Sequence, residues 1–195
     1  MTNPWDAYHA EHEGAKYPSD SLIRFCARYL YGENARALEL GCGNGRNVWY
    51  MAREGIEAYG IDGSEVAIER ARARLRDEGV HATVKQGSVT SIPFHLLSFD
   101  AILDEQCLYA TDEHSILYAL QEAHRVLKSG GLLYSRTFAS FPPYDAGIQV
   151  RVTTEDGIDQ LYGAYFTVES VDKIVWTKNN AVDQIAEWVI VARKE

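Results

Sequence analysis

This sequence predicts a doubly wound α/β fold, and three observations support that prediction. An apolar run at residues 35–40 stops at three alternating glycines and is followed by an amphipathic segment, a pattern typical of a strand, a tight turn and a helix. Further short apolar segments at 58–61, 82–86, 100–104 and 132–137 alternate with helical patterns at 65–77 and 113–127. Strands that alternate with helices form a mostly parallel sheet covered on both faces.

The two ends of the chain lie outside this alternating region. A helix is expected to begin at Ser19 or Asp20, because these capping residues precede apolar residues at helical spacing. The tail is predicted to contain a short helix over Val168–Lys173 capped by Thr167, a strand at 174–177, a turn at Asn179-Asn180 and a strand at 186–192. The last two strands predict a C-terminal hairpin.

The glycine turn has the spacing Gly41-x-Gly43-x-Gly45, and a helix over residues 46–53 follows it. Glycine suits such a turn because it adopts positive φ angles and lets a ligand approach the bare backbone. The start of the following helix offers unpaired N–H groups. A dinucleotide fingerprint would need its third glycine at position 46, where this chain has Arg46. The turn therefore favours a nucleoside-type cofactor and disfavours NAD.

Asp62 ends the second predicted strand, 19 residues after Gly43. A carboxylate at about this distance from a glycine turn usually binds a ribose, because it accepts hydrogen bonds from both vicinal hydroxyls. The alternative is that Asp62 only caps the helix beginning near Ser64.

Composition limits the function classes. The 195 residues predict one domain, and the net charge of −9 argues against a nucleic-acid substrate, which requires a basic surface. No apolar run reaches the length needed to cross a membrane, and the first residues do not have the pattern of a signal peptide. The three cysteines, Cys26, Cys42 and Cys107, lack metal-ligand spacing, so we expect no metal and a cytoplasmic protein.

Four segments, in order, carry a resemblance to a known family. They are Glu39-Leu40-Gly41-Cys42-Gly43-Asn44-Gly45, Tyr59-Gly60-Ile61-Asp62-Gly63-Ser64, Phe99-Asp100-Ala101-Ile102-Leu103-Asp104 and the stretch from Glu122 to Gly131. Together they resemble the motifs of the class I S-adenosylmethionine-dependent methyltransferases, over roughly residues 20–138. The resemblance implies a Rossmann-like, seven-stranded sheet whose last strand runs antiparallel between strands five and six.

The resemblance also implies the residues that bind S-adenosylmethionine. The glycine turn (Gly41, Cys42, Gly43, Asn44, Gly45) would contact its methionine end and ribose, Asp62 with Gly63 its ribose, and Ser88 with Val89 its adenine. Asp104 and Glu105 would line the pocket near the transferred methyl group. Glu39 either orients the turn by accepting backbone N–H groups or binds the cofactor's ammonium. Ser88 stands where the family often has Asp, which predicts a weaker hydrogen bond to the adenine.

The sequence gives weaker signals for the residues that bind the methyl acceptor. Tyr109 and Arg136 are the candidates for catalysis and acceptor binding, and Arg136 either anchors an anionic acceptor or pairs with an acid such as Asp104. Tyr17 and Tyr144 are further candidates for acceptor binding. Residues 1–18 form a candidate lid arm, and residues 138–165 a variable region on the substrate side.

The sequence therefore predicts transfer of a methyl group from S-adenosylmethionine to an O or N atom of a small-molecule acceptor. One alternative is a pseudoenzyme that binds the cofactor and activates or scaffolds a partner. A second alternative is another enzyme on this fold, such as a dehydrogenase, which Arg46 disfavours. The sequence determines neither the acceptor nor the oligomeric state.

Overall fold

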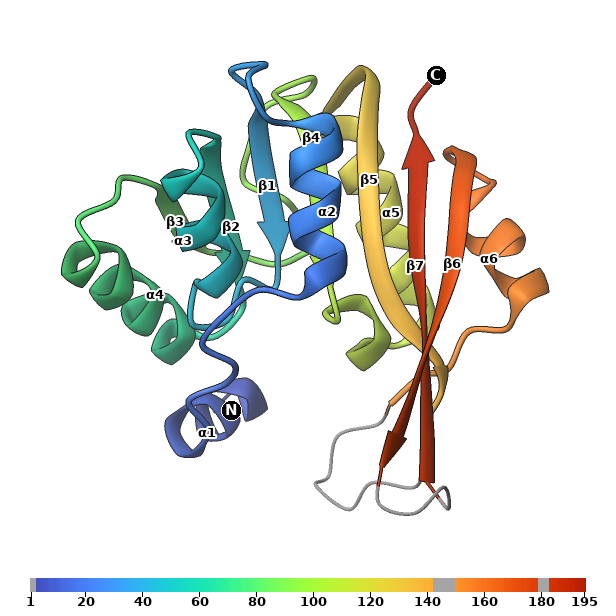
Figure 1. Ribbon diagram of the computed structural model, residues 1–195, viewed down its shortest axis with the longest axis horizontal. Coiled ribbons are helices and arrows are strands. Elements are labelled where there is room, and N and C mark those ends of the chain that lie inside the picture. The colour runs from blue at the N-terminus through green and yellow to red at the C-terminus, as the bar shows by residue number, and fades with distance from the viewer. Residues whose placement is uncertain (1–2, 142–149, 179–182) are drawn as a thin grey trace.

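A computed structural model describes residues 3–141, 150–178 and 183–195. Seven strands form one sheet in the order β3-β2-β1-β4-β5-β7-β6 (Figure 1). Their bounds are β1 Arg36–Leu40, β2 Glu57–Asp62, β3 Thr83–Gln86, β4 Phe99–Glu105, β5 Leu127–Ser140, β6 Thr167–Lys178 and β7 Asp183–Arg193. The helices are α1 Pro4–Glu11, α2 Asp20–Tyr29, α3 Arg46–Arg53, α4 Glu65–Asp77, α5 Glu113–Val126 and α6 Glu155–Tyr162, with a 3₁₀ turn, η1, at Leu108–Ala110.

Strand direction confirms the predicted topology. β1 pairs in parallel with β2 and β4, and β4 pairs in parallel with β5. β7 is antiparallel to both β5 and β6 and lies between them. The carboxyl ends of β1, β2 and β4 therefore meet at one edge of the sheet, where ligands bind in open α/β folds.

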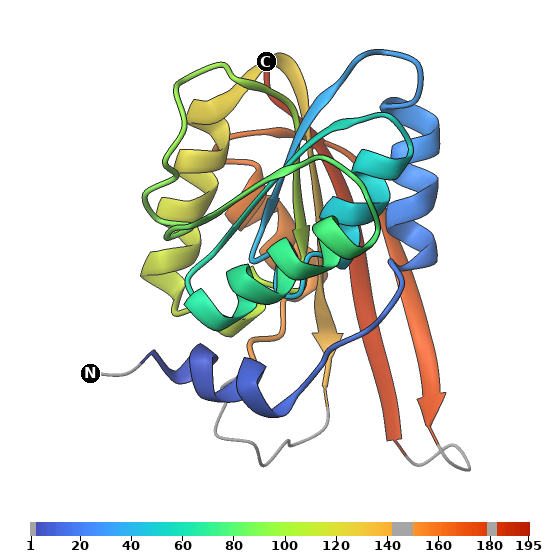
Figure 2. The same ribbon diagram turned by 90° about the vertical axis from the view of Figure 1, so that its left-hand side faces the viewer.

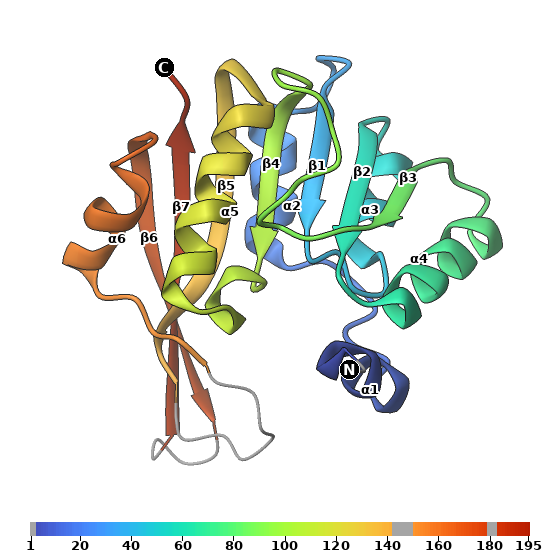
Figure 3. The ribbon, with the colours of Figure 1, turned by 180° about the vertical axis from the view of Figure 1, so that it is seen from behind.

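Two apolar layers cover the sheet because successive side chains of each strand point to opposite faces. Ala37 and Leu103 pack with the layer of α2, α3 and α4, whereas Leu38 and Ile102 pack with the layer of α5 and α6. Figures 2 and 3 show these two helical layers from the side and from behind. Both faces of the central strands are buried, which explains their continuous apolar sequences.

Helix starts follow their capping residues. Ser19 caps α2 and Ser64 caps α4, each accepting a backbone N–H three residues on. Four of the predicted helices begin at the residues expected, namely α2, α3, α4 and α5.

The prediction for the tail is partly wrong. Residues 167–178 form one strand, β6, and contain no helix at 168–173. β6 pairs with β7 along its whole length, so cross-strand hydrogen bonds outweigh the local capping signal of Thr167. The sequence analysis also missed α1 and α6, and the predicted turn at Asn179-Asn180 lies outside the described residues.

Candidate functional site

A cavity of about 790 Å³ lies at the carboxyl edge of β1, β2 and β4. Its size is within the range of small-molecule sites. Ten of the twelve residues predicted to bind the cofactor line it: Glu39, Gly41, Cys42, Gly43, Asn44, Asp62, Gly63, Ser88, Val89 and Glu105. The topology therefore brings together side chains and backbone that are separated by up to 66 residues in sequence.

The glycine turn is tightly packed against neighbouring segments. Gly41 has a φ of +62°, and a Cβ added to it would lie 2.4 Å from Sγ of Cys107. Gly45, with a φ of +74°, lies outside the cavity lining, and a Cβ there would lie 2.8 Å from Cβ of Ala71 on α4. Gly45 thus permits close packing of the turn against α4, and its expected contact with the cofactor gains no support from its position.

Asp62 holds the turn in place. Its Oδ2 accepts the backbone N–H of Gly43 at 2.9 Å, and its Oδ1 accepts that of Ser64 at 2.8 Å. The N-cap of α4 is Ser64 and not Asp62, so the alternative that Asp62 only caps this helix is not supported. Each carboxylate oxygen has a further lone pair, and Asp62 lines the cavity, so it retains the capacity to accept hydrogen bonds from a ligand.

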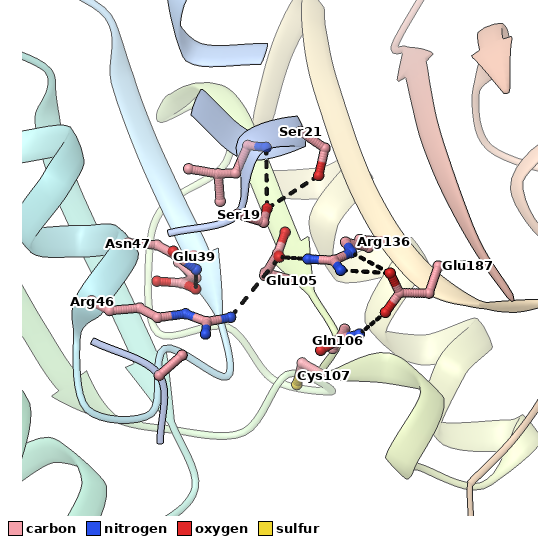
Figure 4. Close-up of polar contacts among 12 residues, drawn as sticks. Ser19, Ser21, Glu39, Arg46, Asn47, Glu105, Gln106, Cys107, Arg136 and Glu187 are labelled. Atoms are coloured by element: carbon pink, nitrogen blue, oxygen red, sulfur yellow. Dashed lines mark hydrogen bonds and ion pairs between the residues drawn. The ribbon is translucent and has the colours of Figure 1, made fainter. Parts of the chain in front are cut away.

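Glu39 is buried below the turn and lines the same cavity. Its Oε1 accepts Nδ2 of Asn47 at 2.5 Å, as Figure 4 shows, whereas its Oε2 is buried without a partner. Burial raises the pKa of Glu39 to about 8, against the opposing effects of Asn47 and Arg46. Asn47 orients the side chain of Glu39. The prediction that Glu39 orients the turn by accepting its backbone N–H groups is therefore wrong.

Asp104 does not line the cavity, contrary to expectation. It is fully buried and accepts the backbone N–H groups of Cys107 and Leu108 and the hydroxyl of Ser135. Burial raises the pKa of Asp104 to about 6, although these hydrogen bonds oppose the shift. Asp104 therefore shapes the turn after β4, and the next residue, Glu105, reaches the cavity.

Arg136 is bound by two buried carboxylates. Its Nη1 lies 2.6 Å from Oε1 of Glu105, and its Nη2 lies 2.5 Å from Oε2 of Glu187 (Figure 4). Glu187 also accepts hydrogen bonds from the side chains of Gln106 and Trp176. Burial tends to lower the pKa of Arg136, but the two carboxylates raise it overall. Of the two sequence interpretations, the structural ion pair is present, with Glu105 and Glu187 in place of Asp104.

A second cavity, of about 870 Å³, lies between α2 and the strands β5, β7 and β6. Tyr17 and Arg136 line this cavity and not the first one. Arg46 and Gln106 line both cavities, so they form a shared wall. Arg46 approaches Glu105 on that wall, with 3.9 Å between its Nη2 and Oε1 of the carboxylate.

The other residues predicted from the sequence lie in different places. Tyr109 lines the first cavity, and its ring packs edge-on against Phe138. Ser88 shares a hydrogen bond of 2.8 Å with the hydroxyl of Thr90. Tyr144 lies outside the described residues.

The N-terminal arm reaches the first cavity, where Trp5, Tyr8 and His9 of α1 contribute to the lining. Figure 1 shows α1 beyond the carboxyl ends of the parallel strands. Asn3 donates to the carbonyl of Gly63, and Arg70 donates to the carbonyl of His12, which anchors the arm to the body of the domain. Burial lowers the pKa of His9, although nearby Asp62 opposes the shift.

Sequence analysis did not single out Arg46 or Asn47 as lining residues, and it placed His9 only within the candidate lid arm. Asn47 carries a signal that could have been used, because it stands in the first turn of the helix that follows the glycines. His9 carries none, since only the docking of α1 on α4 brings it to the cavity.

Comparison with known proteins shows that this chain is similar to methyltransferases. Residues 37–131 match the family model described as a methyltransferase domain. The chain is 31% identical over 97 residues to an uncharacterized methyltransferase of Synechocystis, covering 50% of this chain and 44% of that protein. It is 28% identical over 181 residues to a fatty-acid O-methyltransferase of Mycolicibacterium smegmatis, covering 86% of this chain and 64% of that protein.

A crystal structure of a SAM-dependent methyltransferase from Methanosarcina mazei has the same fold. It superposes with a TM-score of 0.75 at 24% identity, covering 87% of this chain and 96% of the other. Over residues 37–131 the chain is similar to the methyltransferase domain, and its fold is that of this S-adenosylmethionine-dependent methyltransferase. It spans between 40% and 64% of the length of the first curated relatives that it matches.

The cofactor of this methyltransferase family is S-adenosylmethionine, and the residues present fit it. The orphan oxygen of Glu39 is an acceptor for an ammonium group, and Asp62 offers lone pairs to hydroxyls. Carboxylates outnumber cations in the lining, which suits a ligand with two positive centres. No helix in the described part of the chain is long and apolar enough to span a membrane.

Proposed function

We propose that this protein transfers a methyl group from S-adenosylmethionine to an O or N atom of a small-molecule acceptor. The observation that carries the proposal is the first cavity, where a glycine turn, Asp62 and the half-paired Glu39 meet at the carboxyl edge of the sheet. When bound there, the cofactor supplies an electrophilic methyl group on a sulfonium sulfur.

Each part of the cavity has a role in this proposal. Asp62 accepts hydrogen bonds from the ribose hydroxyls while it holds Gly43. Ser88 and Val89, at the far side of the lining, hold the adenine. The aromatic residues of α1 cover the bound nucleoside and exclude water, which makes the arm a lid.

The acceptor is proposed to enter from the second cavity. Tyr17 and Arg136 line it, and the shared wall of Arg46 and Gln106 separates it from the first cavity. In this proposal Tyr109, which lines the first cavity, hydrogen-bonds the nucleophile. Because Arg136 is already held by two carboxylates, its role is to position Glu105 and Glu187 at this wall, and it does not anchor an anion.

Alignment dominates such a reaction. A methyl transfer is an in-line displacement, so the protein contributes orientation and water exclusion, which together account for large rate effects. The names of the relatives support oxygen as the acceptor atom, since four of them are named O-methyltransferases. A cytoplasmic location belongs to the proposal as well, and it is supported by three cysteines that form no disulfide.

The test is a transfer assay with methyl-labelled S-adenosylmethionine and a panel of hydroxyl, carboxyl and amine acceptors, with S-adenosylhomocysteine as the second readout. Label in an acceptor, with one equivalent of S-adenosylhomocysteine, is the expected result. Cofactor binding without product across the panel would favour the pseudoenzyme. Binding of NAD in place of the sulfur compounds would favour a dehydrogenase.

A further inference from the structure

The guanidinium of Arg46, on the wall shared by the two cavities, has hydrogen-bond donors that the protein does not use. Arg46 lines both cavities, and its side chain is 21% exposed. Its Nη2 lies 3.9 Å from Oε1 of Glu105, which is too long for a hydrogen bond, and among the described residues the guanidinium has no closer partner. A guanidinium carries five N–H donors, so Arg46 is able to bind an anion that enters from either side.

The second arginine near this wall is closed to ligands. Arg136 donates to Oε1 of Glu105 at 2.6 Å and to Oε2 of Glu187 at 3.1 Å. Figure 4 shows the guanidinium groups of Arg46 and Arg136 on different sides of Glu105. The two arginines and two carboxylates carry no net charge together, so an added anion meets the donors of Arg46 without displacing a bond that holds the strands.

The groups around the shared wall are poor bases. The wall itself consists of the guanidinium of Arg46 and the amide of Gln106, neither of which accepts a proton near neutral pH. Both oxygens of Glu105 and both oxygens of Glu187 already accept hydrogen bonds. Arg136 beside these carboxylates favours their charged form. An acceptor that had to lose a proton would therefore find no suitable base at this wall.

The second cavity has an apolar floor next to this wall. Its buried lining residues are Phe25, Tyr134, Val189 and Val191. The other charged residues of the lining, apart from those of the network, are exposed to solvent; they are Asp20, Arg24, Arg28 and Asp172. A ligand with an apolar chain or ring would bury that part on the floor, while a charged end would meet Arg46.

We propose that the methyl acceptor is an apolar carboxylic acid, and that Arg46 binds the carboxylate whose oxygen takes the methyl group. The proposal rests on the proposed function and names its acceptor class. The carboxylate oxygen forms a bond to the methyl carbon, and the carbon–sulfur bond of the cofactor breaks with its electron pair left on sulfur. The products are a methyl ester and S-adenosylhomocysteine, and no proton is transferred.

The chemistry of a carboxylate matches this wall in two ways. A carboxylic acid is already ionised near pH 7, so it needs no base. Its two oxygens offer about four lone pairs, so the planar fork of Arg46 can hold the group while one lone pair remains for the methyl carbon.

The first experiment measures binding without turnover. The protein, saturated with S-adenosylhomocysteine, is titrated calorimetrically with the straight-chain acids from butanoate to dodecanoate and with phenylacetate. Each acid is compared with its primary amide and its primary alcohol, which share its apolar body. At least one acid should bind at least tenfold more tightly than its amide and alcohol, because it alone forms charge-assisted hydrogen bonds. Equal affinities within every set would overturn the proposal.

Variants test the role of Arg46. Arg46→Gln should weaken binding of the acid at least tenfold and leave the affinities for the amide and for S-adenosylhomocysteine unchanged. Arg46→Lys, which keeps the charge but not the planar fork, should restore part of the loss. The matched control is Arg53→Gln, at the exposed end of α3 and outside both cavity linings, which should bind as the unaltered chain does.

The same variants exclude a role of Arg46 toward the cofactor. If Arg46→Gln weakens binding of S-adenosylhomocysteine and leaves binding of the acid unchanged, the guanidinium serves the cofactor's own carboxylate and the proposal is overturned. Thermal unfolding of each variant shows whether it is folded, and the comparison of acids with amides on the unaltered chain needs no variant.

A transfer assay then separates this inference from the proposed function. With methyl-labelled S-adenosylmethionine, the label should appear in an acid as an ester that mild alkali cleaves to labelled methanol. Label that resists alkali, in an alcohol or amine and in none of the acids, would overturn the acceptor class while the proposed function stands. If neither S-adenosylmethionine nor S-adenosylhomocysteine binds, the proposed function itself fails.

Discussion

The two cavities of this protein differ in how completely their polar groups are paired. In the described part of the chain, four buried side-chain polar atoms lack a partner, and two of them line the first cavity while none lines the second. On the wall of the second cavity, Arg136 and Glu187 are fully engaged with each other and with their neighbours. Unpaired groups mark a place prepared for a ligand, whereas a closed network mainly holds strands together.

The largest expected effect comes from opening the closed network. Arg136→Met would leave Glu105 and Glu187 buried with their main cation removed, so the free energy of unfolding should fall by about 3–5 kcal/mol. Urea denaturation followed by circular dichroism measures this change. Adding Glu105→Gln and Glu187→Gln should restore much of the loss, because the uncompensated charges are then gone. A loss below about 1 kcal/mol for Arg136→Met would contradict the structural role of the network.

A substitution at Asp62 tests whether the first cavity binds the cofactor. Asp62→Asn should weaken binding of S-adenosylhomocysteine at least tenfold, because hydrogen bonds to a charged acceptor contribute about 1.5–3 kcal/mol. The side chain keeps one oxygen for Gly43 or Ser64, so the domain should remain folded. Calorimetric titration gives the affinity, and thermal unfolding serves as the control. Unchanged affinity would leave Asp62 with only its role in the turn.

Glu39 predicts a pH dependence of stability in the absence of ligand. Its folded pKa is raised to about 8, so between the unfolded pKa of about 4.3 and this value the folded state holds the proton that the unfolded state has lost. The contribution of this group therefore falls as pH rises through that window, by at most about 1.4 kcal/mol per unit. Glu39→Gln should flatten this fall, which unfolding curves from pH 5 to 8 would reveal. Parallel curves for the two proteins would contradict the raised pKa.

The smallest effect is expected at the rim of the second cavity. Trp176→Phe keeps an aromatic ring but removes the N–H donor to Glu187, which retains Arg136 and Gln106. The free energy of unfolding should fall by no more than about 1 kcal/mol, and affinity for S-adenosylhomocysteine should not change. In a transfer assay, a raised KM for the acceptor with unchanged cofactor affinity would support acceptor entry through this cavity. An unchanged KM would place the acceptor elsewhere.

The sequence by itself determined the parallel sheet, the glycine turn and the edge at which Glu39, Gly43 and Asp62 meet. These follow from local patterns, because apolar strands, capping residues and glycines act over a few neighbouring positions and the parallel topology places their ends together. The same reasoning could not separate Asp104 from Glu105, since adjacent strand residues point to opposite faces and only packing decides which face holds the cavity.

Only the tertiary structure decided which charged side chains form ion pairs with one another. The pairing of Arg136 with Glu105 and Glu187 joins residues 31 and 51 positions apart, and the docking of α1 carries His9 to the glycine turn. The strand at 167–178 likewise depends on its partner β7. Each of these features is stabilised by contacts between distant segments, whose energies are absent from any short stretch of sequence.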